Sequence, residues 1–296
     1  MDTLHLIVNP AAGRGRGLAF LDAVTAGLRS GGREVSVHTT ARAGEARALV
    51  EAVPAGGTVV AMGGDGTVHE LLAACLARDL RLGVVPCGSG DDFAFALGIA
   101  RDDPGAAVAT VLAGRERRLD VGLVNGEPFV NAFGAGFDAD VARRVLAAPR
   151  RFRGLGRYLY GILAAMREFR LAEARLELID GEGRRLAFAG PSLLVTVQNG
   201  PRGGGSFLFA PGAQPDDGLF DVLVAGAFGR LGTLGILPKV MRGAHLGHPR
   251  IHRFAAHTLT LSWSTAMAAH AEGELLAPAD RFEVTLRPRA LRVLAP

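Results

Sequence analysis

Short strand-like runs that alternate with helical segments, with glycine at each change, occupy the first 115 residues of the chain. The runs LHLIVN, REVSVH, TVVAMG and LGVVP are rich in branched apolar side chains and predict four buried strands. Helical spacing occurs at 18–29, 45–52, 68–78 and 91–97. This alternation predicts right-handed crossovers, and therefore a parallel sheet covered by helices on both faces. Ligands of such sheets bind at the carboxyl ends of the strands.

The pattern changes after about residue 118 to longer β-rich segments. They read RRLDVGLVNG, EPFVNAFGAG, ARLELIDG, PSLLVTVQNG, GLFDVLVAGA, HTLTLSWS and RFEVTLRP, and helical spacing returns at 154–169 and more weakly at 231–241. We therefore expect an α/β protein with a Rossmann-like parallel domain at 1–119 and a mostly antiparallel, β-sandwich-like domain at 120–280. The last strand, at about 281–296, is expected to return to the first domain.

Composition removes several classes of protein from consideration. Lys239 is the only lysine, and its surroundings, ILPKVM, fit neither a Walker A loop, nor a pyridoxal Schiff base, nor a protein kinase. The two cysteines exclude a four-cysteine zinc site and a disulfide framework, and suggest a reducing compartment. No run of about 18 uncharged apolar residues occurs, so we expect a protein that is soluble or rests on a membrane surface.

Three glycine-rich turns follow predicted strands. The first, NPAAGRGRG, is open to two interpretations: a backbone that approaches a phosphate, or a flexible connection. The second, AMGGDGTVHE, is more specific, because its glycines surround Asp65 at a strand end while Thr67 is placed to cap the next helix. In the third, VVPCGSGDDFAFALG, Asp91 or Asp92 is placed to cap a helix. Three such turns at one sheet edge predict a cradle for polyphosphate.

Several other patterns are weaker. GAGFDA satisfies a dinucleotide pattern but lacks its context, so we interpret it as an interdomain turn in which Asn131 and Asp138 offer polar contacts. The histidines of HLGHPRIH predict a solvated basic loop in preference to zinc. Cys87 is either a modifiable thiol or, by default, a small residue at the edge of the core.

The same motifs carry a family resemblance. NPAAG, GGDGTVHE, PCGSGDDFA, LDVG, NAFGAGFDADVA, GGGSFLFAPGAQPDDGLFDV and the late EGE occur in family order between residues 9 and 274. The chain thereby resembles the diacylglycerol kinase catalytic-domain family, most closely its bacterial soluble lipid kinases, which are related to sphingosine kinases. GGDGT together with DDGLFDV is highly specific, whereas NPAAG is not.

The resemblance implies a nucleotide site for ATP and roles for particular residues. The implied ATP-binding residues are Asn9, Pro10, Ala11, Ala12, Gly13, Thr40, Gly63, Gly64, Asp65, Gly66, Thr67 and Ser89. Thr40 is equally well explained as a strand-end cap. Two positions depart from the family pattern. Asp91 replaces an amide, and its carboxylate would repel a phosphate group toward which it pointed. Glu272 stands where an aspartate is usual.

Metal and catalytic roles are implied as well. The family places Mg²⁺ in the DDGLFDV loop, which points to the Asp217 carboxylate and the main-chain carbonyls of Gln214 and Leu219; a hairpin turn is the alternative. Glu274 matches the general base for the lipid hydroxyl, and Asp65 is the alternative base or the organiser of magnesium. Asp120 matches a family acid, or else forms an ion pair with Arg117 or Arg118.

The segment RRFRGLGRYLYGILAAMREFR combines arginines with an apolar stripe. Arg150, Arg151, Arg153 and Arg157 accompany Leu155, Leu159, Ile162, Met166 and Phe169 at near-helical spacing. We favour a helix that packs its apolar stripe on the β domain, while its arginines remain candidates for contact with anionic headgroups.

Together these features predict a cytoplasmic, ATP- and Mg²⁺-dependent lipid kinase that binds a membrane lipid peripherally and binds no nucleic acid. Diacylglycerol, phosphatidylglycerol, a sphingoid base and a prenol all fit as acceptors, and the sequence leaves the oligomeric state undefined. The alternatives are an NAD kinase-like enzyme with a soluble substrate and a catalytically degenerate nucleotide-binding regulator at the membrane.

Overall fold

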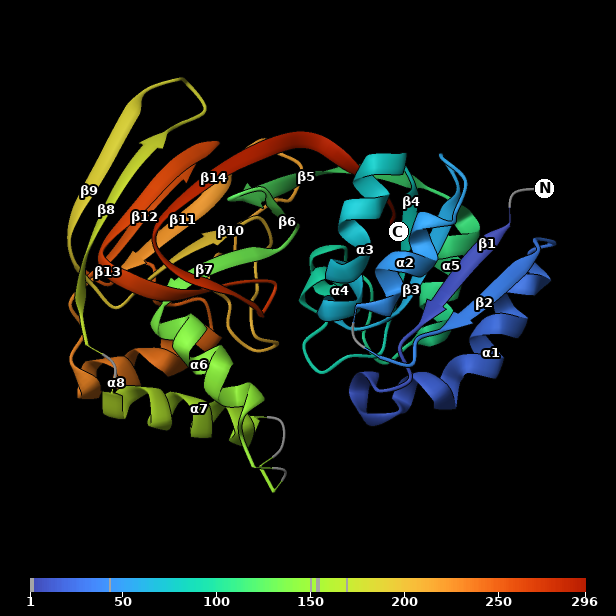
Figure 1. Cartoon of the computed structure of the whole chain (residues 1–296), viewed down its shortest axis with the longest axis horizontal. Coiled ribbons are helices and arrows are strands. Elements are labelled where there is room, and N and C mark those ends of the chain that lie inside the picture. Colours follow the sequence, from blue (N-terminus) through green and yellow to red (C-terminus); the bar gives the residue numbers. More distant parts are fainter. Residues whose placement is uncertain (1–2, 43, 150, 153–154, 169) are drawn as a thin grey trace. The chain divides into compact units, whose positions relative to one another are not determined.

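A computed structural model describes every residue of the chain except 1–2, 43, 150, 153–154 and 169 (Figure 1). The chain forms two compact units. Unit 1 comprises residues 1–121 and 288–296, and unit 2 comprises residues 122–287. The boundary predicted from the sequence lies after residue 119.

Unit 1 is built on a parallel sheet. Its strands, in spatial order, are β2 (Val35–Thr39), β1 (Leu4–Val8), β3 (Thr58–Gly63), β4 (Arg81–Pro86) and the end of β14 (Glu274–Leu294). β3 is buried along its whole length, which explains its unbroken apolar sequence. Its helices are the 3₁₀ turn η1 (Ala12–Arg14), α1 (Arg16–Ser30), α2 (Glu45–Glu51), α3 (Asp65–Arg78), α4 (Asp92–Ala96) and α5 (Pro104–Ala113).

The order of the strands places a switch point beside β1. The connection through α1 leads from β1 to the neighbour on one side, while α2 leads back past β1 to β3, and α3 continues in that direction to β4. Because each crossover is right-handed, α1 covers one face of the sheet and α2 and α3 cover the other (Figure 1). The carboxyl ends of β1 and β3 therefore meet at the position where open α/β sheets bind ligands.

Unit 2 is mostly antiparallel. Its main path runs through β12 (Ile251–Ala256), β11 (Phe220–Ala225), β10 (Leu194–Gln198), β7 (Ala132–Gly136), β13 (Thr258–Ala271) and β14. Its remaining strands are β8 (Ala172–Ile179), which pairs with β13 and with β9 (Arg185–Ser192), and β6 (Glu127–Phe129), which pairs with β5 (Glu116–Val124). The helices are α6 (Phe137–Leu146), α7 (Leu155–Glu168) and α8 (Arg230–Met241), and they lie together along one side of the strands (Figure 1).

Two apolar clusters stabilise unit 2. One joins the strands and includes stacked Phe129 and Phe220, with ring centroids 5.5 Å apart, and the pair Phe133 and Phe282 at 5.4 Å. The other lies among α6, α7 and α8 and contains Ile162, Met166 and Ile236. A parallel α/β domain and an antiparallel, sandwich-like domain confirm the predicted fold class.

The structure gives the bounds of the elements inside several predicted segments. The β-rich segment EPFVNAFGAG contains two strands, because β6 ends at Phe129 and β7 begins at Ala132. PSLLVTVQNG likewise contains the end of β9 and then β10. The GAGFDA segment is a strand-to-helix junction inside unit 2, not an interdomain turn, since β7 ends at Gly136 and α6 begins at once.

Candidate functional site

The three glycine-rich turns converge at the carboxyl ends of β1, β3 and β4. Asn9 N–H donates to the Met62 carbonyl at 3.0 Å, which joins the first turn to β3. Cys87 N–H donates to the Gly63 carbonyl at 2.8 Å, which joins the third turn to the second. These bonds continue the parallel ladders of the sheet past the strand ends, so the sheet itself holds the turns together.

The turns approach one another so closely that side chains are excluded. A Cβ on Gly88 would lie 2.5 Å from the Gly64 Cα, and one on Gly13 would lie 1.9 Å from the Cys87 carbonyl oxygen. Gly13 also has a φ of +54°, in the region where glycine is favoured. The glycines are therefore needed for contact between the turns as well as for access by a ligand.

Asn9 and Thr67 form a link between the first and second turns. Asn9 Oδ1 accepts the Ala11 N–H at 3.0 Å, while Asn9 Nδ2 donates to Thr67 Oγ1 at 3.1 Å. The predicted capping role of Thr67 is wrong: the N-cap of α3 is Gly64, with no side-chain cap bond, and the Thr67 hydroxyl is directed to Asn9. Pro10, Ala12 and Gly13 are half-buried beside this link, whereas Ala11 is exposed.

Asp65 stands in the first turn of α3 and supports a neighbouring helix. Its Oδ1 accepts the Phe93 N–H, at the start of α4, at 3.0 Å. The Asp65 side chain is half-buried, and Gly64 and Gly66 on either side of it leave the backbone uncovered by side chains. Ser89, in the next turn, is exposed.

Asp91 does not cap α4 with its carboxylate, although it is the N-cap residue. With a φ of +55° it turns back, so that its Oδ1 accepts the Gly88 N–H at 2.8 Å, and Oδ2 lies 3.3 Å from Arg101 Nε. Burial, followed by the negative charge of Asp65, raises the Asp91 pKa to about 6, against the opposing effects of Gly88, Arg101 and Arg16. The acid that replaces the family amide is thus enclosed within its own turn.

Two arginines near this cradle were missed by the sequence analysis. Arg16 pairs with Asp102 at 2.7 Å, and its charge acts on Asp91 and on the Cys87 thiol. Arg101 donates from Nη2 to the Gly88 carbonyl at 3.2 Å in addition to its ion pair with Asp91. The basic residues inside GRGRG were the available signal for Arg16, whereas nothing local in the sequence pointed to Arg101.

Three further candidates in unit 1 are buried. Thr40 is 6 % exposed and donates from Oγ1 to the Val8 carbonyl at 3.3 Å, as its strand-end interpretation requires. Asp120 is fully buried and accepts the Arg289 N–H at 2.7 Å. Cys87 is also fully buried, and burial together with Asp91 raises its pKa to about 11, which favours the unreactive thiol.

In unit 2, the turn between β13 and β14 carries Glu272 and Glu274. Glu272 has a φ of +56°, and its Oε1 accepts the N–H groups of Val130 and Asn131 at 2.7 and 2.6 Å. This carboxylate occupies the break between β6 and β7, where the strand ladder is interrupted. Glu274 begins β14 two residues later and is exposed.

A polar cluster lies next to this turn. His270 Nδ1 accepts the Gly273 N–H at 3.2 Å, and Nε2 lies 3.4 Å from Asp138 Oδ2. Gly134 leaves room for the pair, because a Cβ there would lie 2.0 Å from Asp138 Oδ2. Asn131 donates to the Arg202 carbonyl at 2.8 Å. The Asp138–His270 pair thus braces the turn that bears Glu274.

The predicted metal loop precedes β11. Asp217 is exposed, and its Oδ1 accepts the Leu219 N–H at 3.0 Å, which stabilises the bend; Gln214 is also exposed. Across the described part of the chain, no group of three or more His, Cys, Asp or Glu side chains is placed to hold a metal ion.

The prediction of a solvated loop for the three histidines is wrong in part. His245 is 2 % exposed, and burial lowers its pKa. His248 packs on Phe228 with ring centroids 5.0 Å apart, and His252 lies in β12 against Phe188 at 4.9 Å. The apolar rings around this segment, not basic residues alone, determine its conformation.

The helix predicted at 154–169 is α7, and its apolar stripe is divided. Ile162 and Met166 are buried in the helical cluster, whereas Leu159 is 45 % exposed. Arg157 donates to the Val145 and Leu146 carbonyls at 2.7 and 3.2 Å, so it caps the end of α6. Arg151 is exposed; Arg150, Arg153, Phe169 and the side chain of Leu155 lie outside the described residues.

Comparison with known proteins agrees with both units. Residues 3–124 match the family model of the diacylglycerol kinase catalytic domain. Residues 131–295 match that of the YegS C-terminal NAD kinase beta sandwich-like domain. The chain therefore belongs to the lipid kinase family in which these two domains are combined, and it is a kinase.

Relatives extend over nearly the whole chain. A "Diacylglycerol kinase" of Bacillus subtilis is 31 % identical, over 93 % of this chain and 90 % of its own length. A "Probable lipid kinase YegS-like" of Pseudomonas aeruginosa is 32 % identical, over 96 % and 92 %.

Solved structures share the fold. The crystal structure of a diacylglycerol kinase from Bacillus anthracis gives a TM-score of 0.74 at 18 % identity, covering 100 % of this chain and 97 % of that one. The crystal structure of a "putative diacylglycerol kinase" from the same species gives a TM-score of 0.81 at 21 % identity, covering 100 % of this chain and 95 % of that one.

Proposed function

We propose that the protein transfers the γ-phosphate of ATP to a hydroxyl group of a membrane lipid. The observation that carries the proposal is the convergence of the three glycine-rich turns at the switch point of the unit 1 sheet. Membership in a lipid kinase family supports the reaction class. The acceptor lipid and the roles of individual residues are part of this proposal.

The nucleotide site belongs to unit 1. The amino end of α3 follows Gly64 directly, so its first N–H groups face a ligand placed at the turn, and the helix dipole favours a phosphate there. Arg16, with a side chain 34 % exposed, adds positive charge near the turns. A polyphosphate fits this cradle because the glycines bring backbone, rather than side chains, to its surface.

The residues of the Asp217 loop suit Mg²⁺, which prefers oxygen ligands and takes only one or two carboxylates in addition to water. The Asp217 carboxylate and the carbonyls of Gln214 and Leu219 would hold it, and the exposure of Asp217 leaves room for water ligands. A bound magnesium ion would neutralise phosphate charge or stabilise the loop.

We assign the general base to Glu274. Phosphoryl transfer requires a group that accepts the proton of the attacking hydroxyl, and an exposed carboxylate on a braced turn can reach a substrate. Asp65 is assigned to the organisation of the phosphate side, since it stands among the glycines at the amino end of α3. The full burial of Asp120 and its bond to Arg289 N–H support a structural role.

The acceptor is proposed to reach the enzyme from a bilayer. No helix among the described residues has the length and apolar character to cross a membrane. We propose peripheral contact at the cytoplasmic face, where ATP is available to a kinase whose acceptor lies in the bilayer. Diacylglycerol, phosphatidylglycerol, sphingoid bases and prenols remain the candidate acceptors.

Radiolabelled ATP presented with vesicles of each candidate lipid tests the proposal. We expect one lipid class to become labelled by the wild type, and no labelling above background by Glu274→Gln or Asp65→Asn. Both changes keep the size of the side chain, and the amide oxygen introduced by Asp65→Asn can still accept the Phe93 N–H, so circular dichroism and thermal melting should match the wild type. Labelling of NAD or another soluble alcohol, or wild-type turnover by both variants, would contradict the assignment.

The departures from the family pattern do not favour a degenerate regulator. Asp91 is held by Gly88 N–H and Arg101, and Glu272 binds two N–H groups of the neighbouring chain segment. Both carboxylates are thus held by partners within the protein. These partners explain how the two acids are accommodated, which supports an active enzyme.

A further inference from the structure

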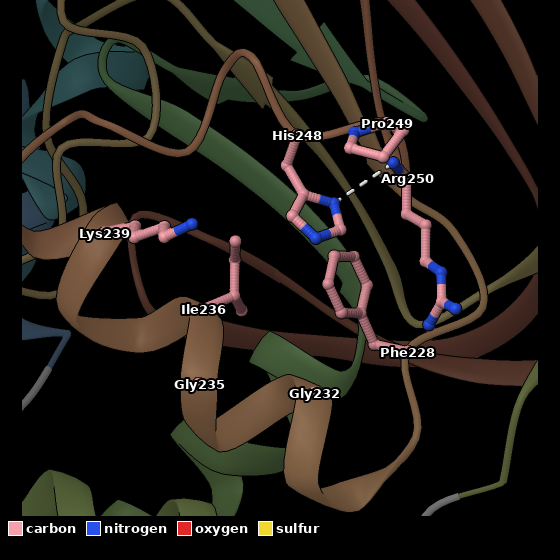
Figure 2. Close-up of a pocket in the computed structure, with 8 residues that line it drawn as sticks. All are labelled: Phe228, Gly232, Gly235, Ile236, Lys239, His248, Pro249 and Arg250. Carbon is pink, nitrogen blue, oxygen red and sulfur yellow. Dashed lines mark hydrogen bonds between the residues drawn. The ribbon is translucent and has the colours of Figure 1, made fainter.

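A pocket in unit 2, separate from the glycine turns and from the Glu274 turn, lies between α8 and the segment that leads into β12. Its volume is about 400 Å³, within the range typical of small-ligand sites. The residues that line it are Phe228, Gly232, Gly235, Ile236, Lys239, His248, Pro249 and Arg250 (Figure 2). We define these residues as the α8 pocket.

The α8 pocket combines an apolar floor with a basic rim. Phe228 and Ile236 are 4 % and 7 % exposed, and they form the floor. Lys239 and Arg250 are exposed and supply the positive charges of the rim, and the His248 ring lies beside them. No acidic residue occurs among the described residues that line it. An anionic group is the ligand that this charge distribution recognises.

Arg250 and His248 are held in place by contacts within the protein. Arg250 Nη1 donates to the Ala227 carbonyl at 3.0 Å, and its guanidinium lies 5.9 Å from the centroid of the Phe228 ring. His248 Nδ1 accepts the Arg250 N–H at 3.1 Å while its ring packs on Phe228. Figure 2 shows the second ring nitrogen of His248 turned away from that bond, on the side of the Phe228 ring. A guanidinium that is already held in place, as that of Arg250 is, loses little freedom when it binds an anion.

The outer face of the same helix is apolar and exposed. Leu231 is 85 % exposed and Leu234 is 37 % exposed, and Pro238 continues this stripe. With spacings of three and four residues they form one row on α8, beside the row of Gly232, Gly235 and Lys239 that lines the pocket. An exposed apolar row next to a basic pocket is the pattern of a surface that binds at a lipid interface.

We infer that the α8 pocket binds the phosphate of an anionic phospholipid headgroup, with Leu231 and Leu234 inserted at the acyl boundary. The inference deepens the proposed function by assigning the peripheral membrane contact to α8, instead of the arginines of the α7 segment. The basic rim favours a lipid with an anionic headgroup, because opposite charges attract. The exposed leucine row favours a phosphate carried by a bilayer over one free in solution.

Vesicle flotation without nucleotide tests the surface independently of phosphoryl transfer. The vesicles contain phosphatidylcholine alone or equal parts of phosphatidylcholine and phosphatidylglycerol. Lys239→Glu reverses one exposed charge in the pocket, and we expect it to lower the partition coefficient on phosphatidylglycerol vesicles by about thirtyfold, since two charge units are lost at an anionic surface. Leu231→Ser with Leu234→Ser should lower binding to both vesicle types.

Arg185→Glu is the matched control, because Arg185 is exposed on β9 at the β8–β9 hairpin and carries the same charge. It should bind phosphatidylglycerol vesicles nearly as the wild type does. If Lys239→Glu and Arg185→Glu lost vesicle binding equally, the effect would be one of net charge, and the assignment of binding to the α8 pocket would be wrong. A second outcome would also contradict the inference. If glycerol 3-phosphate in solution displaced the bound protein and the leucine changes had no effect, the ligand would be a soluble phosphate and not a lipid in a bilayer.

Turnover separates failure of this inference from failure of the proposed function. On a short-chain acceptor dispersed in solution, Lys239→Glu should keep wild-type activity while its vesicle binding falls. Loss of that soluble activity would overturn the assignment of Lys239 to membrane contact alone.

Discussion

Among single residues, Asp91 combines the most unusual environment with the clearest structural explanation. It is 3 % exposed, near the negative charge of Asp65, and held by Gly88 N–H and Arg101. Its carboxyl pKa rises from 3.8 to about 6, so the folded protein holds this proton more tightly than the unfolded chain does. The resulting contribution to stability is complete below about pH 4 and is lost as the pH rises through about 6.

Asp91→Asn should therefore stabilise the protein in a pH-dependent manner. The amide oxygen can still accept the Gly88 N–H, and no buried charge forms. Relative to the wild type, we expect little difference near pH 4 and a gain of up to about 3 kcal/mol in the free energy of unfolding above pH 6. Urea unfolding across this pH range measures it, and a constant difference at every pH would contradict the assigned pKa.

Glu272 provides a second test at the scale of one side chain. Glu272→Ala leaves the N–H groups of Val130 and Asn131 without this acceptor, and bonds to a charged group are among the stronger ones. We expect a loss of about 3 kcal/mol in the unfolding free energy of unit 2. Asp280→Ala, an exposed change on β14, is the control and should have little effect. An equal stability for the two variants would show that the bonds contribute nothing.

At the scale of elements, the junction between β7 and α6 depends on Gly136. Its φ is +104°, and a Cβ there would lie 2.8 Å from the Leu193 carbonyl oxygen. Gly136→Ala combines backbone strain with a collision against main-chain atoms, so we expect a loss of more than about 2 kcal/mol in stability. Gly156→Ala, on α7, has open space around the new Cβ and should be neutral or slightly stabilising. Thermal melting of both variants is the measurement, and the two should differ clearly.

The elements that could be predicted from sequence are those whose signal is local. Strand β3 and helix α3 were predicted because an apolar run, a glycine turn and helical spacing follow one another within 21 residues, from Thr58 to Arg78. Helix α5 was missed, although Asp103 caps it by accepting the Ala106 N–H at 2.8 Å and Pro104 stands at its first position. Its sequence is dominated by alanine and valine and shows little polar face, so periodicity did not reveal it.

The candidate site divides in the same way. The convergence of the turns follows from the alternation of strands and helices, which places the carboxyl ends of parallel strands at one edge, and that alternation is readable in the sequence. The burial of Asp91 was not predictable, because it depends on Arg101, ten residues away, and on Asp65 in another turn. The contact between Glu272 and the β6–β7 break is likewise a pairing across more than 140 residues, which no single sequence displays.

At the scale of the whole molecule, the last segment of β14 completes the sheet of unit 1. Arg292 and Val293 pair in parallel with Arg81 and Leu82 of β4. Arg292 also binds Glu116 at 2.9 and 2.7 Å and Asp79 at 3.0 Å, which ties the strand to the rest of unit 1. Leu291, Val293 and Leu294 are buried.

In a chain that stops after Arg287, unit 1 should therefore be destabilised more than unit 2. Removal of three buried side chains and of the partner strand of β4 is expected to lower the unfolding free energy of unit 1 by about 5 kcal/mol. Limited proteolysis should cut within residues 3–121 first, and the thermal shift on addition of ATP should vanish. A chain that lacks only Pro296, which is exposed, is the control and should behave as the wild type. Resistance of the shorter chain to proteolysis would show that β14 is dispensable to unit 1.

This strand has a consequence for the timing of synthesis. A ribosome that has translated the first 121 residues has made every glycine turn of the cradle, yet the sheet beneath them is missing an outer member that is encoded after the whole of unit 2. The emerging α/β segment must remain incomplete while the entire second unit is translated. Any premature stop codon upstream of residue 288 then leaves unit 1 unfinished as well, so truncated products should be cleared as misfolded chains instead of persisting as free fragments of unit 1.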